Sequence, residues 1–133
     1  FRRVLFRSGE ALELPVVEYA NMQVNHPDSK LGIQGVGTAI TGAHMYRGKQ
    51  IPALRGQLVI SDWSASFKQA SGQLFVAHPA SNGKLWTMEK MLQLESRIIS
   101  LSEDLEGEIY VLTHEGMGPF GNTGKIFKLV AKP

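Results

Sequence analysis

The chain has 133 residues, of which 43% are hydrophobic and none is cysteine. The length suits one domain or part of a larger one, and the hydrophobic share argues against a disordered chain. The lack of cysteine excludes disulfides, thiolate metal sites and a cysteine nucleophile, and no apolar run reaches the roughly 20 residues that a membrane helix needs.

The first residues suggest a foreign segment. Residues 2–8 read RRVLFRS, which the codons AGA CGT GTG CTC TTC CGA TCT encode, and these codons match a common sequencing adapter. We therefore expect residues 1–10 to be a translated adapter or a disordered start, and residues 11–133 to form the folded part. The alternative is the basic end of a genuine strand.

A foreign origin of residues 2–8 would change the meaning of the charge. The chain carries 14 Lys and Arg residues against 12 acidic ones, a net charge of +2. Without Arg2, Arg3 and Arg7 the basic residues number 11 and the net charge becomes −1. The charge then indicates neither a nucleic-acid partner nor a membrane surface.

Short apolar runs alternate with turn residues along the rest of the chain. The runs are rich in β-branched and aromatic residues and are bounded by Gly, Pro, Asn, Asp or Ser, which is typical of strands. Strands are predicted at residues 12–20, 38–48, 56–63, 72–79, 85–94, 97–104, 107–115 and 124–132. Tight hairpin turns are predicted at residues 81–83 (SNG) and 105–107 (LEG).

Residues 85–94 are ambiguous, because apolar residues recur there at helical spacing and Met, Glu, Lys and Leu favour helix. We predict a strand, since the surrounding run of strands leaves little room for a lone helix.

A weak repeat bears on the fold class. GQLVIS, GQLFVA, GEIYVL and GKIFKL each place Gly and one polar residue before an apolar core. Antiparallel strands in succession suggest a sandwich, a barrel or a propeller, and propeller blades are four-stranded units of about 40–45 residues. We predict an all-β propeller fragment, with one blade at residues 38–94 and three strands of a closing blade at residues 97–132.

Three strings carry a family resemblance. AITGAHMYRGKQIPALRGQLVISDWS (residues 39–64) holds an ITG element, a strand ending in YRG, a Pro-containing turn and a Gly-led strand. GQLFVAHP and ISLSEDLEGEIYVLTHEGMGPFGNTGKIFKLV follow at residues 72–79 and 99–130. In order and spacing this set resembles the C-terminal part of the glucose/sorbosone dehydrogenase family, the soluble quinoprotein sugar dehydrogenases, over roughly residues 12–130.

The resemblance implies a six-bladed β-propeller. It also implies a protein that is periplasmic or secreted. Its best-known members bind pyrroloquinoline quinone (PQQ) and Ca²⁺ on the central axis and oxidise the C1 hydroxyl of an aldose to a lactone. The partners would be a sugar and an electron acceptor. The resemblance places the catalytic His base and most calcium ligands in earlier blades, so neither a catalytic nor a metal-binding residue is assigned here.

Cofactor-binding candidates follow from the same resemblance. Arg97 stands where PQQ-binding relatives carry a cofactor-contacting Arg, although the usual R-x-R-D context is missing. Asp62 and Trp63 occupy a turn that supplies a Lys in those relatives, and Lys68 in the longer loop here is the candidate replacement. Thr41 lies in the ITG element near the axis. The alternatives are a solvated Arg97 and Lys68, blade-to-blade packing by Trp63 and an ordinary strand hydroxyl at Thr41.

The remaining polar residues point to no site. The histidines are scattered without metal-binding spacing, and we expect each to be at the surface or half-buried (His26, His44, His78 and His114). The acidic residues 103–108 lack the order of an EF-hand, and a solvated hairpin is expected there. The rival functions are a non-catalytic propeller that acts as a binding module, and an unrelated carbohydrate-binding β-sandwich.

Overall fold

The computed structural model describes residues 15–22, 35–81, 84–118 and 120–132. The adapter prediction for residues 1–10 and the turn residues 82–83 lie outside these ranges. The described residues form an all-β structure of two antiparallel sheets with one short 3₁₀ turn and no α-helix. Within the same ranges, no helix has the length and apolar character to cross a membrane.

The first sheet is a four-stranded meander in the order β1-β2-β3-β4. Its strands are β1 (Ile40–Met45), β2 (Leu58–Asp62), β3 (Gln73–His78) and β4 (Thr87–Gln93), and the 3₁₀ turn η2 (Pro52–Leu54) lies between β1 and β2. All three pairings are antiparallel, as predicted for residues 38–94. The helical alternative for residues 85–94 is wrong, because β4 pairs with β3 along its whole length.

The second sheet has three strands in the order β5-β6-β7: β5 (Arg97–Glu103), β6 (Ile109–His114) and β7 (Lys125–Lys128). The predicted turn between β5 and β6 is confirmed. Gly107 has a φ of 80°, which L side chains rarely adopt, and its N–H donates to the Asp104 carbonyl at 3.0 Å.

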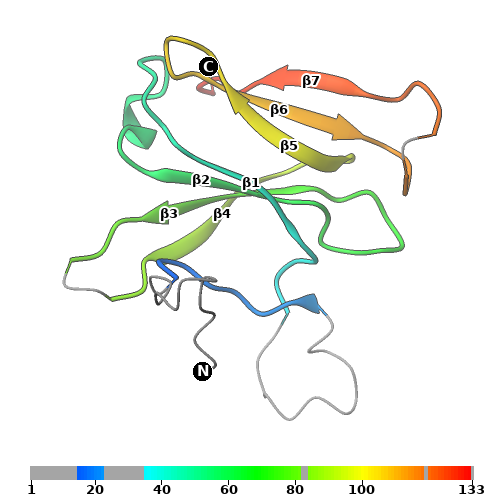
Figure 1. The fold of residues 1–133 in the computed structure, drawn as a ribbon, viewed down its shortest axis with the longest axis horizontal. Coiled ribbons are helices and arrows are strands. Elements are labelled where there is room, and N and C mark those ends of the chain that lie inside the picture. Colours follow the sequence, from blue (N-terminus) through cyan, green and yellow to red (C-terminus); the bar gives the residue numbers. More distant parts are fainter. Residues whose placement is uncertain (1–14, 23–34, 82–83, 119, 133) are drawn as a thin grey trace, which may run out of the picture.

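The two sheets lie one over the other, with β1 and β2 of the first against β5 of the second (Figure 1). The shared core between them includes Val59, Leu74, Ile98 and Val111. The sheets approach closely at Gly42, where an added Cβ would lie 2.9 Å from the backbone nitrogen of Leu101. A larger residue there would push β1 away from β5.

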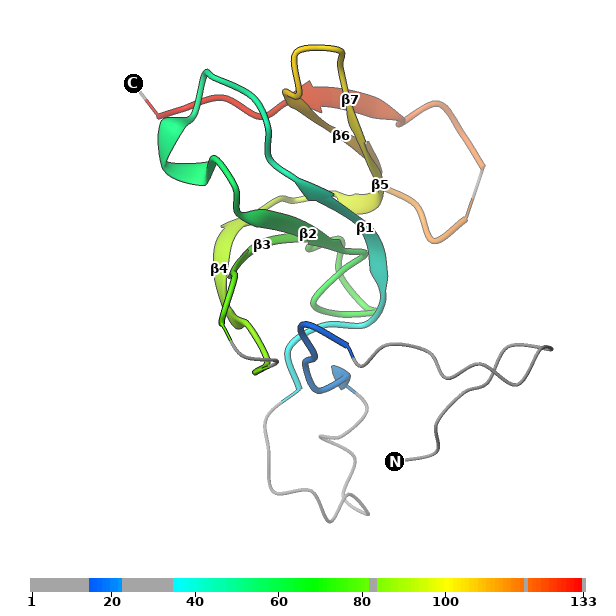
Figure 2. The ribbon, with the colours of Figure 1, turned by 60° about the vertical axis from the view of Figure 1, so that its left-hand side comes forward.

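Residues 15–22 cover the opposite face of the four-stranded sheet, away from the three-stranded one (Figures 1 and 2). Val17 packs against the cluster of Ile60 and Phe75, and the Tyr19 ring stacks on Phe75 with centroids 6.1 Å apart. The strand predicted at residues 12–20 is wrong for its described part, because residues 15–20 form no ladder. They make single bonds instead, such as Trp86 N–H to the Val16 carbonyl at 2.7 Å.

The expected solvated hairpin at residues 103–108 is corrected at Glu108, which is only 2% exposed. Its carboxylate accepts hydrogen bonds from the Tyr46 hydroxyl at 2.6 Å and from the backbone N–H groups of Lys49 and Gln50 at 2.8 and 3.0 Å. Glu108 therefore joins the second sheet to the segment that follows β1. A buried carboxylate is tolerated here because each oxygen has partners.

Candidate functional site

Most of the predicted site residues lie together at one end of the strands of the two sheets. At this end β2 finishes at Asp62 beside the start of β3, and β5 begins at Arg97, opposite His114 at the end of β6. Two backbone hydrogen bonds connect the two sheets at this end. The Ile98 N–H donates to the Trp63 carbonyl at 3.0 Å, and the Gly72 N–H donates to the Ser96 carbonyl at 2.7 Å. The loop after β2 therefore lies directly against the start of β5.

Arg97 is buried at this end of the strands, with 5% of its surface exposed. One terminal nitrogen donates to the Glu115 carbonyl at 2.5 Å and the other to the Phe67 carbonyl at 3.2 Å. The Nε atom is buried without a hydrogen-bond partner. Among the described residues Arg97 has no ion pair, so its charge is balanced by carbonyl dipoles and one aromatic ring alone.

That ring belongs to Trp63. The Arg97 guanidinium carbon lies 4.9 Å from the Trp63 ring centroid. The Phe67 ring is tilted against the Trp63 ring, with the two centroids 5.6 Å apart. Cation–π contacts of this kind contribute about 0.5–2 kcal/mol, most when desolvated. We name Trp63, Phe67, Lys68 and Arg97 the aromatic–arginine cluster.

A small cavity borders this cluster. It has a volume of about 250 Å³ and is lined by Met22, Ser66, Phe67 and Lys68. Lys68 is exposed, and its backbone N–H is held by the Ser66 hydroxyl at 3.1 Å. The loop thus presents a solvent-facing ammonium group one residue from the carbonyl that Arg97 binds. Sequence reasoning missed Phe67, although an aromatic beside a candidate Lys was visible.

Asp62 has a different environment, because its carboxylate is fully buried and already supplied with donors. It accepts hydrogen bonds from the backbone N–H groups of Thr38, Ala39 and Ser64 at 3.2, 2.8 and 3.0 Å. The Tyr19 hydroxyl donates to it at 2.5 Å. Burial, followed by the bond to the carboxylate, raises the pKa of Tyr19.

The surroundings of Asp62 are tight as well, since a Cβ on Gly37 would lie 2.4 Å from its Oδ2. In this structure Asp62 fastens the loop after β2 to residues 36–39. Thr41 makes a local contact in the first sheet: its hydroxyl lies 3.0 Å from the Ser61 hydroxyl.

The described residues fit the two expected cofactor components unequally. For a planar ligand that carries carboxylates, Lys68 offers an exposed ammonium, whereas the Arg97 Nε is buried and the Trp63 ring already contacts the guanidinium. For Ca²⁺, the described ranges contain no cluster of three or more His, Cys, Asp or Glu side chains.

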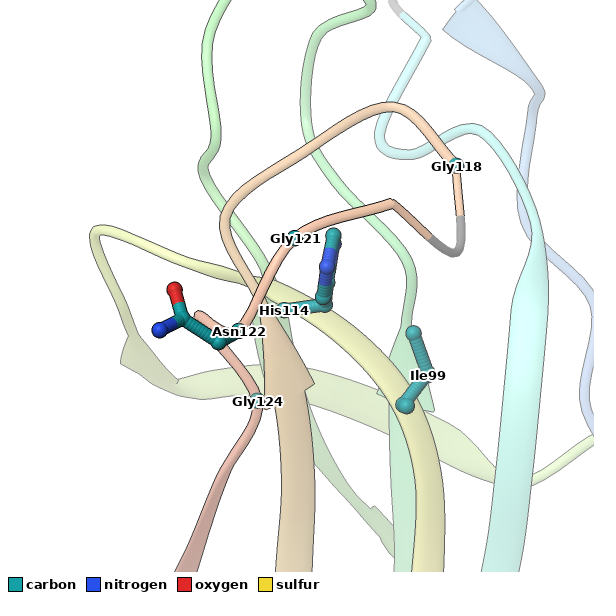
Figure 3. A pocket seen from close by; sticks show the side chains of 6 residues that line it. All are labelled: Ile99, His114, Gly118, Gly121, Asn122 and Gly124. Atoms are coloured by element: carbon teal, nitrogen blue, oxygen red, sulfur yellow. The ribbon is translucent and has the colours of Figure 1, made fainter.

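A second cavity lies next to the cluster, in the loop between β6 and β7. It measures about 650 Å³ and is lined by Ile99, His114, Asn122 and three glycines (Figure 3). Arg97 touches this loop through the Glu115 carbonyl. His114 is half-buried, as expected from the sequence.

A scan against models of known protein families finds no match to this chain.

Proposed function

We propose that this chain is part of a quinoprotein sugar dehydrogenase of the β-propeller type, which oxidises the C1 hydroxyl of an aldose to a lactone with PQQ as hydride acceptor. The observation that carries the proposal is Arg97, which is buried over the Trp63 ring without a carboxylate partner among the described residues and lies close to the loop of the exposed Lys68. A periplasmic or secreted location is part of the same proposal.

The strand order supports a propeller over a sandwich. Each sheet consists of strands that are consecutive in the chain, with β1 to β4 in one and β5 to β7 in the other. β-Sandwiches commonly use Greek-key connections that pass between sheets, whereas blades are meanders that follow one another. The first strands of both sheets, β1 and β5, pack together as neighbouring inner strands of a propeller would.

The site chemistry supports an anionic cofactor. A buried guanidinium that has carbonyl partners but no carboxylate partner among the described residues attracts an anionic ligand, since the hydrogen bond would be charge-assisted and water is excluded. Lys68 adds a second cation that can turn toward the ligand because its side chain is exposed. The Trp63 ring holds the guanidinium plane in place.

When bound, PQQ supplies a quinone that accepts hydride from C1 while a base takes the hydroxyl proton. The residues of this chain would bind and orient the group: Arg97 and Lys68 through its carboxylates, Trp63 through its ring. The proton acceptor is not assigned to any residue here.

A second candidate is a non-catalytic propeller that acts as a binding module. It is favoured by the two carbonyls that already occupy the terminal nitrogens of Arg97. In that case Arg97 serves to fasten the Phe67 and Glu115 loops together, and a cofactor is not required.

The test is PQQ binding by the chain itself. In a Trp86→Phe background Trp63 is the remaining tryptophan, and we expect added PQQ to quench its fluorescence. Lys68→Ala should weaken binding by about 10- to 150-fold, as expected when one charge-assisted contact of about 1.5–3 kcal/mol is lost. Because Lys68 is exposed, this variant should fold normally.

The matched control is Lys84→Ala, which removes another exposed Lys near the start of β4. It should bind PQQ like the parent chain. Equal affinity of Lys68→Ala and the parent would remove Lys68 from the site. Absence of quenching in the parent chain would overturn the cofactor proposal and leave the binding module.

A further inference from the structure

We propose that the free edge of β7 pairs with the same edge of a second copy of this chain, in an antiparallel register centred on Phe127. The pairing joins the three-stranded sheets of the two copies into one continuous sheet. The inference goes beyond the proposed function and does not rest on it, because the pairing needs no cofactor and none of the residues of the aromatic–arginine cluster.

The edge strands of the two sheets differ in regularity. They are β1 and β4 in the first sheet and β5 and β7 in the second. The strands β1, β4 and β5 each carry a bulge, because their pairing with the neighbouring strand shifts at Thr41, Met91 and Ile99 respectively. A bulge twists an edge strand and opposes further pairing. In the described structure β7 pairs with β6 from Lys125 to Lys128 without such a shift, so β7 is the edge that keeps a regular strand geometry.

The backbone of β7 presents free hydrogen-bonding groups on its outer side. The Leu129 N–H donates to the Ile109 carbonyl at 2.8 Å, which fixes the alternation of the ladder between β6 and β7. By that alternation the backbone groups of Phe127 point toward β6, and those of Ile126 and Lys128 point away from it. These outward groups have no backbone partner among the described residues. Figure 1 shows β7 on the outer side of its sheet, away from the four-stranded sheet.

The side chains of β7 do little to protect this edge. Ile126 is 69% exposed. Lysines on an edge strand commonly oppose pairing through their charge, but both lysines of β7 have partners within the chain. Lys125 pairs with Glu115 at 2.8 Å, and Lys128 lies 3.5 Å from Asp104. Because these carboxylates offset the two positive charges, repulsion between two β7 edges is weakened.

The direction of the backbone groups restricts the register. Outward-facing residues must lie opposite outward-facing residues of the other copy, because these residues exchange the backbone hydrogen bonds. Ile126 then lies opposite Lys128 of the second copy, and Phe127 lies opposite Phe127 of the second copy. The two Phe127 residues form a non-hydrogen-bonded pair, in which the Cα atoms are about 4.5 Å apart and aromatic side chains pack favourably.

The neighbouring registers that satisfy the same rule fit less well. A register centred on Lys128 places like charges directly opposite each other, which is destabilising. A register centred on Ile126 uses residues 122 and 123 of the loop before β7 in place of Leu129, which continues the ladder with Ile109. In the register centred on Phe127, neither lysine of β7 lies opposite a lysine of the other strand.

Cysteine cross-linking tests the register, because the chain contains no cysteine of its own. Phe127→Cys places two thiols in one non-hydrogen-bonded pair, and a Cα separation of about 4.5 Å lies within the range of a disulfide. We expect a disulfide-linked dimer as the main product of mild oxidation. Ile126→Cys is the matched control, because residue 126 is diagonal to its own copy at about 7–8 Å, too far for a disulfide.

Leu105→Cys reports random collisions, since Leu105 is fully exposed in the turn after β5. Equal cross-linking at residues 126 and 127, or cross-linking at residue 126 alone, would overturn the antiparallel register. Cross-linking of Phe127→Cys no greater than that of Leu105→Cys would overturn the pairing itself.

Sedimentation velocity of the cysteine-free chain tests the pairing independently, and we expect a dimer whose share rises with concentration. Ile126→Pro removes one outward N–H, and proline is tolerated on an edge strand where the N–H faces solvent. This variant should keep its circular dichroism spectrum and lose the dimer. Ile126→Ala shortens the same side chain but keeps the N–H, so it should retain more dimer. A parent chain that stays monomeric at every concentration, or a dimer that survives Ile126→Pro, would overturn the proposal.

Discussion

The two sheets differ in how their faces are covered. In the four-stranded sheet, β2 and β3 are buried along almost their whole length, because residues 15–22 pack on one face and β5 on the other. In the three-stranded sheet, β6 alternates buried and half-buried residues and β7 is mostly exposed. A strand that is covered on both faces is continuously apolar, whereas a strand covered on one face alternates.

The largest expected effect lies in the doubly covered sheet. Leu74 in β3 is fully buried between the sheets, while Leu92, its partner in β4, is 41% exposed. We expect Leu74→Ala to lower the free energy of unfolding by about 2–5 kcal/mol, because it leaves a cavity. Urea denaturation followed by circular dichroism measures this change.

Leu92→Ala is the matched control. It should lower the free energy of unfolding by less than about 1 kcal/mol, because the Leu92 side chain is already exposed to solvent. Equal costs for the two variants would show that the sheet is not covered on both faces as described.

The contact between the sheets gives the next effect. Tyr46→Phe removes the hydroxyl that donates to the Glu108 carboxylate at 2.6 Å and leaves the ring in place. We expect a loss of about 1–3 kcal/mol in the free energy of unfolding, as for a buried group that loses its partner. Tyr110→Phe, at a half-buried position in β6, should cost less. If Tyr46→Phe left the free energy of unfolding unchanged, the hydrogen bond between Tyr46 and Glu108 would not stabilise the contact between the sheets.

The same pair predicts an acid sensitivity. The hydrogen bond from Tyr46 holds the pKa of Glu108 below its ordinary value of 4.5. The unfolded chain therefore binds a proton at Glu108 more readily than the folded chain does. The stabilisation that comes from the lowered pKa is present above pH 4.5 and is lost as the pH falls through the lower folded pKa. We expect the melting temperature to fall in this window.

Tyr46→Phe should flatten that acid dependence, because it removes the largest cause of the lowered pKa. The comparison is the melting temperature of both chains measured across the same pH series. A parallel decline in the two chains would assign the acid sensitivity to other carboxylates.

The smallest effect on stability concerns the uncovered sheet. Ile126 in β7 is 69% exposed, and β7 has an unpaired edge in the described structure. We expect Ile126→Lys to change the free energy of unfolding by no more than about 0.5 kcal/mol, yet to reduce self-association, because a charge on an exposed edge strand opposes pairing.

Sedimentation velocity at several concentrations would measure that association. Leu105→Lys changes an exposed residue in a turn and should leave association unchanged. If both variants reduced association equally, general charge and not the sheet edge would be responsible.

The repeat seen in the sequence has a structural counterpart. Each Gly-led unit places one polar residue before its apolar core, and each makes a distant hydrogen bond. Gln57 bonds His78 at 2.9 Å, Gln73 bonds the Val36 carbonyl at 2.8 Å, Glu108 bonds Tyr46, and Lys125 bonds Glu115. The sequence marked these positions but carried no sign of their partners.

Local chemistry in the sequence was sufficient for the strands β1 to β7 and for the turn at Gly107, because β-branched runs and glycine act over a few residues. The resemblance, and not local chemistry, named Arg97 and Trp63 as candidates, and it did not disclose that they stack on each other. Tertiary structure alone decided that residues 15–20 cover a sheet instead of joining one, and that Glu108 is buried. Both outcomes depend on partners far away in the chain, which strand periodicity cannot report.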